Sequence, residues 1–275
     1  MVKKIFGKSY IALILLLMYA PILLLITFSF TDSKLIGTWN GISFVLYKDM
    51  VQNEELMTAL YNTILIAVVS SLCSTVLGTI GAIGIFYSKR RFKRVMNGLN
   101  QIPVLNAEIV TAIALTILFV ALGIEFSFFT LLIGHMVLTI PFVVLSVIPK
   151  LNQLDPNTYE AALDLGATPR KALWSVISPE IRPGVFSGFL LAITLSLDDF
   201  VITQFTTGPG LLSAGDPKIV TLSILIQDKI KKGPIPPVMR ALTTIIFLLV
   251  VLGVVGVTIY RRFQDKKVVR KARRA

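Results

Sequence analysis

Six long runs of apolar residues dominate the sequence and limit the folds that this chain can adopt. Each run has about the 20 residues that a helix needs to cross roughly 30 Å of hydrocarbon. With 55% hydrophobic and only 15% charged residues, a soluble fold of this size cannot bury so much apolar surface. We therefore predict an all-α, polytopic membrane protein with six transmembrane helices. The expected spans are Ser9–Phe30, Ala59–Ser88, Ile102–Leu122, Phe128–Ile148, Pro183–Phe205 and Val238–Tyr260.

Lysine and arginine gather in alternate connecting segments, and this pattern orients the chain. Of the 27 Lys and Arg, twenty fall on one side of the membrane: three in the N-terminal arm, five in the second loop, four in the fourth and eight in the tail. Cytoplasmic segments carry this excess, so we expect both termini in the cytoplasm. The net charge of +12 then belongs to the inner membrane face, and the basic tail 261–275 is expected to lie on anionic lipid. A nucleic-acid partner is not needed to explain the charge.

Few residues of the chain are of the types that form disulfides, bind metals or bind nucleotides. The single cysteine, Cys73, excludes an internal disulfide and a cysteine metal site. The lone His135 is interpreted as a hydrogen-bonded core residue. No Gly-x-x-x-x-Gly-Lys-Ser/Thr run is present, so no nucleotide-binding loop is expected. We predict that residues 1–275 form one membrane domain that is not an enzyme and binds no metal or cofactor itself.

Three carboxylates fall within the expected spans: Glu108 in the third, and Asp198 and Asp199 in the fifth. Intramembrane charges are costly and mark functional candidates, and carboxylates without a Lys or Arg in the same span suit the path of a cationic substrate. Adjacent helical residues point about 100° apart, so one aspartate is expected to face the path and the other to cap a break or bond a neighbouring helix. Alternatively, Ser, Thr or backbone groups of neighbouring helices satisfy each carboxylate.

The depth of these carboxylates leaves their grouping open. Counted from the inner end of its span, Glu108 is about six residues deep and Asp198 about fifteen, or ~22 Å along the axis. They form either one site or successive stations.

The inner segment 150–182 is the longest polar stretch between spans on that side. Asp155-Pro156 is a helix cap followed by proline at the first helical position, and Gly166 suits the left-handed residue that closes a helix. Thr168-Pro169 begins a second helix in the same manner. We predict a short helix, a break and another helix.

The same segment resembles the cytoplasmic loop signature of ABC importer permeases, in which Glu-Ala-Ala is followed at set intervals by Gly, an apolar residue and Pro. Val176 stands for the usual Ile, and Ser178 for the usual Leu. The resemblance implies a type I ABC importer permease fold, with a coupling helix in this loop that docks on a separate ATPase. The matching residues that are expected to form the ATPase contact are Glu160, Ala161, Ala162, Gly166 and Pro179.

The resemblance also implies a set of partners. These are a sister permease, expected to form a heterodimer with this chain, two ATP-binding subunits that hold the ATP and Mg, and an extracytoplasmic solute-binding protein. The expected location is the bacterial cytoplasmic (inner) membrane, which the chain would cross several times.

From the second span to Arg240, the chain resembles the permeases of spermidine/putrescine importers. Where that family usually has Pro-Asp in the third span, this chain has Ala107-Glu108. The resemblance implies translocation of polyamines by alternating access. The alternatives left open are a permease of the same family for an aminophosphonate, a thiamine-like cation or an iron complex, and an ion-gradient-driven secondary transporter. The matching pieces are Leu122–Ile124, Leu138–Val144, Leu195–Phe200 and Phe205–Pro209.

Overall fold

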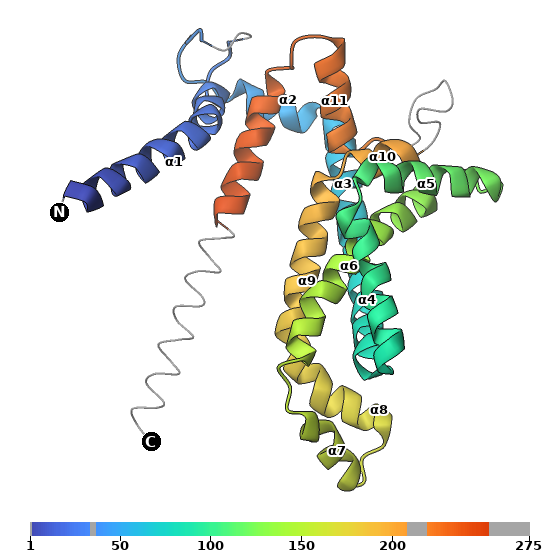
Figure 1. Cartoon of the computed structure of the whole chain (residues 1–275). Helices are drawn as coiled ribbons and strands as arrows, with labels where there is room; N and C mark the ends of the chain where they lie inside the picture. Colours follow the sequence, from blue (N-terminus) through green and yellow to red (C-terminus); the bar gives the residue numbers. More distant parts are fainter. Residues whose placement is uncertain (1, 34–36, 208–218, 253–275) are drawn as a thin grey trace. The chain divides into compact units, whose positions relative to one another are not determined.

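The computed structural model describes residues 2–33, 37–207 and 219–252, and in these ranges every regular element is a helix, as predicted (Figure 1). In chain order the elements are α1 (Val2–Ser29), α2 (Val45–Gln52), α3 (Glu54–Tyr87), α4 (Arg90–Leu105), α5 (Glu108–Ala121), α6 (Phe128–Leu151), α7 (Pro156–Asp164), α8 (Pro169–Ala172), the π-helical turn η1 (Leu173–Ile177), α9 (Ser178–Asp198), α10 (Val201–Thr206), α11 (Leu222–Lys232) and an apolar helix Val238–Leu252.

Long apolar helices account for most of the expected spans. Within the described ranges, four helices are long and apolar enough to cross a membrane, and the bent pair α4 and α5 brings the number to as many as five. The helix Val238–Leu252 begins where the sixth span is expected. The rest of that span and the basic tail 261–275 lie outside the described residues. The four long stretches are Ser9–Ser29, Glu54–Tyr87, Phe128–Leu151 and Pro169–Asp198.

Two expected spans are not single helices. The prediction of one helix over Ile102–Leu122 is wrong, because α4 ends at Leu105, α5 begins at Glu108, and the two are bent by 105°. The fifth span ends earlier than expected, since α9 stops at Asp198 and α10 is a separate helix. Both breaks lie within apolar sequence, so hydropathy averaged over a window does not reveal them.

Residues 58–228 form one compact unit, in which α6 packs along α9 (Figure 1). Glycine brings these helices close: a Cβ at Gly188 of α9 would lie 3.2 Å from the Cα of Val143 in α6. Small residues allow such contacts between membrane helices. The buried core that joins α3, α6, η1 and α9 consists of Ala82, Val143, Val144, Val147, Leu151, Ile177, Ile181 and Ala192.

Residues 1–57 and 229–275 form the other unit. Here the hydroxyl of Ser29, the last residue of α1, lies 2.8 Å from that of Tyr47 in α2. Arg240 is buried near the start of the helix Val238–Leu252 and donates from Nη1 to the carbonyl of Ser33 at 3.0 Å. The first contact joins the end of α1 to α2, and the second joins the start of the helix Val238–Leu252 to the segment between α1 and α2.

Candidate functional site

The break between α4 and α5 carries Glu108. Asn106 and Ala107 have extended backbone, and Ala107, at φ −62° and ψ 134°, has a conformation that proline would also adopt. The bend therefore forms without the proline that the spermidine/putrescine importer permeases, the family that the sequence resembles, usually have at this position. Glu108 is the first residue of α5 and its side chain is exposed. A carboxylate in the first turn of a helix is favoured by the helix dipole.

The break between α9 and α10 is organised by Asp199. Its backbone is extended, with φ −65° and ψ 123°. Its carboxylate accepts hydrogen bonds from the backbone N–H of Ile202 at 3.1 Å and from that of Thr203 at 2.8 Å. The hydroxyl of Thr203 donates to Oδ2 at 2.8 Å, and that of Ser223 in α11 donates to the carbonyl of Asp199 at 2.9 Å. Asp199 thus caps α10, while Asp198 ends α9 with an exposed side chain.

The packing of α10 on α5 and α6 brings the two breaks together. Thr116 of α5 donates to the carbonyl of Phe205 in α10 at 3.0 Å, and a buried cluster of Ala112, Leu138 and Ile202 joins the three helices. Glu108 is close enough to interact electrostatically with both Asp199 and Asp198. The structure therefore brings the three predicted carboxylates together, and we call the exposed pair Glu108 and Asp198 the acidic site.

Among the described residues, no group of three or more His, Cys, Asp or Glu side chains is placed to hold a metal ion.

His135 is the buried, hydrogen-bonded residue that the sequence predicts. Its Nδ1 lies 2.8 Å from Ser196 Oγ of α9, and its Nε2 lies 2.9 Å from Thr203 Oγ1 of α10. Nε2 is also 3.7 Å from Asp199 Oδ2. Sequence reasoning did not connect His135 with the aspartates, because 61 and 64 positions separate it from Ser196 and Asp199 along the chain. No local signal could have found this link.

The segment 150–182 has the predicted helix, break and helix. Asp155 accepts from the N–H of Asn157 at 2.9 Å, which caps α7, and Thr168 accepts from that of Lys171 at 3.4 Å, which caps α8. Gly166 has φ +83°, the left-handed conformation that closes a helix at little cost for glycine. Glu160, Ala161 and Ala162 lie in α7, with Glu160 and Ala161 exposed, and Pro179 lies in the first turn of α9.

This segment begins at the end of α6, contacts α3 through α7 and continues into α9. The ring of Tyr159 in α7 lies 5.1 Å from that of Tyr87, the last residue of α3. On the other side, α8 continues through η1 into α9, which runs to Asp198 (Figure 1). Leu165 and Trp174, which sequence reasoning did not single out, are 89% and 76% exposed. Exposed large apolar side chains next to the matched loop residues extend the surface that a partner can cover.

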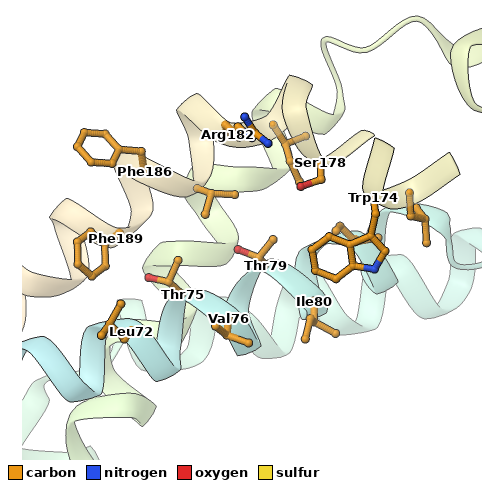
Figure 2. Close-up of a pocket in the computed structure, with 14 residues that line it drawn as sticks. Leu72, Thr75, Val76, Thr79, Ile80, Trp174, Ser178, Arg182, Phe186 and Phe189 are labelled. Atoms are coloured by element: carbon orange, nitrogen blue, oxygen red, sulfur yellow. The ribbon is translucent and has the colours of Figure 1, made fainter. Parts of the chain in front are cut away.

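A groove of about 680 Å³ lies between α3 and the η1–α9 segment (Figure 2). Leu72, Val76 and Ile80 line it from α3, and Phe186 and Phe189 from α9. The charged residue of its lining is Arg182, and none of its lining residues is acidic. Apolar walls beside a guanidinium do not favour a cation, so this groove is a poorer cation site than Glu108 and Asp198.

Comparison with known protein sequences adds three findings. The sequence model of the family described as "binding-protein-dependent transport system inner membrane component" matches residues 74–270. The chain is 31% identical over 266 residues to the spermidine/putrescine transport system permease protein PotC of Escherichia coli (strain K12), covering 97% of both chains. It is 33% identical over 251 residues to the putrescine transport system permease protein PotI of the same strain, covering 87% of this chain and 83% of PotI.

A solved structure supports the fold. The chain is similar, with a TM-score of 0.69 and 15% sequence identity, to a chain in the crystal structure of a bacterial ABC transporter involved in the import of the acidic polysaccharide alginate. The match covers 95% of this chain and 96% of the other.

Proposed function

The chain belongs to the family of binding-protein-dependent transport system inner membrane components, the permeases of ABC importers, and we propose that it translocates polyamines such as spermidine or putrescine. The observation that carries this proposal is the acidic site, where two helix breaks bring Glu108 and Asp198 within electrostatic reach of each other. The names of the relatives that are 31% and 33% identical support the same substrate class.

The chemistry of a polyamine matches this arrangement. Its amino groups, like that of lysine, are protonated at neutral pH, and short methylene chains separate them. Two carboxylates on neighbouring breaks contact two ammonium groups at once, while the apolar side chains of α5 and α10 suit the methylenes. Each contact between exposed charges is weak, which allows the cargo to leave.

The alternative substrates differ in how they would meet two carboxylates. A thiamine-like cation or an iron complex would be attracted to negative charge, whereas the phosphonate group of an aminophosphonate would be repelled. Family membership removes the ion-gradient-driven secondary transporter from the alternatives. Polyamines remain the class that both the pair of carboxylates and the names of the relatives favour.

Alternating access would be driven through the segment 150–182. In this proposal α7 docks on an ATPase through Glu160, Ala161 and Ala162, with Gly166 and Pro179 shaping the ends of the segment. Closure of the ATPases would move α3 through the contact between Tyr159 and Tyr87, and α9 through η1. Because α9 spans 21 residues and ends at Asp198, its movement as a rod would shift the acidic site directly.

The assembly proposed here contains this permease, a sister permease, two ATP-binding subunits and an extracytoplasmic solute-binding protein. The chain itself would bind no nucleotide and make no covalent bonds, because ATP and Mg belong to the partner ATPases. Both termini would lie in the bacterial cytoplasm, with the tail 261–275 on the anionic inner face of the membrane.

Uptake by the complete transporter in proteoliposomes tests the proposal. The variants D198N and E108Q remove one charge each at nearly constant size. We expect each to lower the uptake of labelled spermidine roughly fivefold, the factor for one partly solvated charge pair, while the complex still assembles. E125Q removes an exposed carboxylate from the turn between α5 and α6 and serves as the control.

Unchanged uptake in both D198N and E108Q would refute the acidic site as a polyamine path. Competition by unlabelled putrescine, thiamine or an aminophosphonate against spermidine then distinguishes the substrate classes. Displacement of labelled spermidine by thiamine alone would indicate that the transported substrate is a different cation.

A further inference from the structure

Five buried side chains form a continuous hydrogen-bonded chain across residues 58–228. Ser70 Oγ of α3 lies 3.0 Å from Ser196 Oγ of α9, which lies 2.8 Å from His135 Nδ1 of α6. His135 Nε2 lies 2.9 Å from Thr203 Oγ1 of α10, and Thr203 Oγ1 lies 2.8 Å from Asp199 Oδ2. The chain therefore links four helices to the carboxylate that caps the break before α10.

The number of available protons determines which group donates in each bond of this hydrogen-bonded chain. The Asp199 carboxylate accepts from three donors and donates in none of these bonds. The one hydroxyl proton of Thr203 therefore goes to Asp199, so Thr203 Oγ1 accepts from the Nε2–H of His135. The Nδ1 of neutral His135 is then an acceptor and takes the proton of Ser196.

The Ser70 end of the hydrogen-bonded chain is assigned in the same way, because each hydroxyl has one proton to donate. With its proton given to His135, Ser196 can only accept from Ser70. Every hydroxyl thus donates in the direction of Asp199 or His135. The imidazole is held in the Nε2–H tautomer because Ser196 donates to Nδ1 and Thr203 accepts from Nε2. Chains of this kind strengthen each bond through mutual polarisation.

The surroundings leave the break little freedom once this chain is formed. A Cβ at Gly134, next to His135, would lie 2.7 Å from Ile202 Cγ2, so α10 rests directly on the backbone of α6. A charge in the membrane interior is tolerated only with partners. Movement of Asp199 away from Thr203 would strand that charge, and Asp198, which is covalently joined to Asp199, would move with it.

We propose that His135 is a positioning residue for the acidic site: its Nε2–H holds Thr203 and Asp199 in the break, and this keeps Asp198 exposed. The inference rests on the proposed function insofar as Asp198 contacts the substrate. His135 itself does not touch the cargo. Its contribution is to select one arrangement of the break from those that the extended backbone at Asp199 allows.

Two substitutions of His135 distinguish its hydrogen bond with Thr203 from its hydrogen bond with Ser196. The amide of glutamine, one methylene longer, reaches the place of Nε2 and can donate to Thr203, whereas the amide of asparagine reaches the place of Nδ1 and serves only Ser196. H135Q therefore preserves the bond that the proposal needs, and H135N removes it. S74A is the matched control, because the equally buried hydroxyl of Ser74 bonds Thr139 (2.7 Å), which donates only to the backbone carbonyl of His135 and not to its ring.

Spin-label distances in the full transporter provide the test. Nitroxides are attached through D198C and L145C in a C73S background, since both positions are exposed and Cys73 is the chain's single cysteine. Double electron–electron resonance is expected to give one narrow distance for the parent, H135Q and S74A. In H135N the fraction of molecules whose label distance differs from that of the parent should rise about tenfold. This is the factor expected for the loss of one buried hydrogen bond in a network that contains a charged group.

A second pair of variants makes the same test without touching His135. T203S keeps the hydroxyl and should give the narrow distance, whereas T203V removes it and should broaden the distribution. Narrow distances in both H135N and T203V would overturn the inference, and so would equal broadening in H135Q and H135N. If both D198N and E108Q leave uptake unchanged while H135N still broadens the distance, the proposed function fails and the positioning of residue 198 stands.

Discussion

Asp198 and Asp199 are consecutive residues with opposite environments: the side chain of Asp198 is exposed, whereas that of Asp199 is 1% exposed. The helix stops between them, and the extended backbone of Asp199 turns its carboxylate onto the N–H groups of Ile202 and Thr203. One carboxylate therefore holds the break, and the other is left exposed at the end of α9.

Removing the Asp199 carboxylate should destabilise the protein. In D199A the N–H groups of Ile202 and Thr203 lose their acceptor, and a lost helix cap costs about 0.5–2 kcal/mol. D199N keeps one acceptor oxygen and should be milder. The measurement is the thermal midpoint of the purified transporter, with D198A as the control. The explanation is wrong if D198A lowers the midpoint as much as D199A.

The charges of Glu108 and Asp198 should act together. Residues of one site show coupled effects, whereas distant residues act additively. We expect the double variant E108Q/D198N to reduce spermidine uptake by less than the product of the two single reductions, because the first substitution already disables the paired contact. A double-mutant cycle on initial uptake rates measures this coupling. Strict additivity would instead support successive stations.

Gly134 should tolerate no side chain. In G134A the new Cβ would lie 2.7 Å from Ile202 Cγ2 and 3.1 Å from Thr206 Oγ1, and overpacking of this kind costs about 1–3 kcal/mol. G81A is the matched control, since nothing lies within 4 Å of a Cβ at Gly81 on α3. The thermal midpoint should fall in G134A and stay constant in G81A. I202A, which removes the clashing methyl, should partly restore G134A, and a failure of this rescue would place the strain elsewhere.

The contact between Tyr159 and Tyr87 should affect coupling more than folding. Y159A removes a ring pair worth about 0.5–1.5 kcal/mol beyond its buried area, so α7 would move with less effect on α3. We expect fewer spermidine molecules transported per ATP hydrolysed, while ATP hydrolysis continues and Y159F behaves as the parent. Y61A removes an exposed tyrosine of α3 and is the control. An unchanged ratio in Y159A would exclude this route of transmission.

Local chemistry was sufficient to predict much of this protein. Apolar runs about 20 residues long predicted the positions of α1, α3, α6 and α9, because the length that crosses hydrocarbon depends only on the chain itself. The caps Asp155 and Thr168 and the left-handed Gly166 were also predicted, since a cap is made by residues two or three positions away.

The sequence by itself determined that this chain is a membrane protein with a capped helical segment between its fourth and fifth expected spans. It also supplied the three carboxylates. Only the tertiary structure decided that α4 and α5 meet at 105°, that Glu108 comes within reach of residues 90 positions away, and that Asp199 rather than Asp198 is the cap. The physical reason is that span length and capping depend on neighbouring residues, whereas the exposure of a charge depends on packing between helices that are distant in the chain.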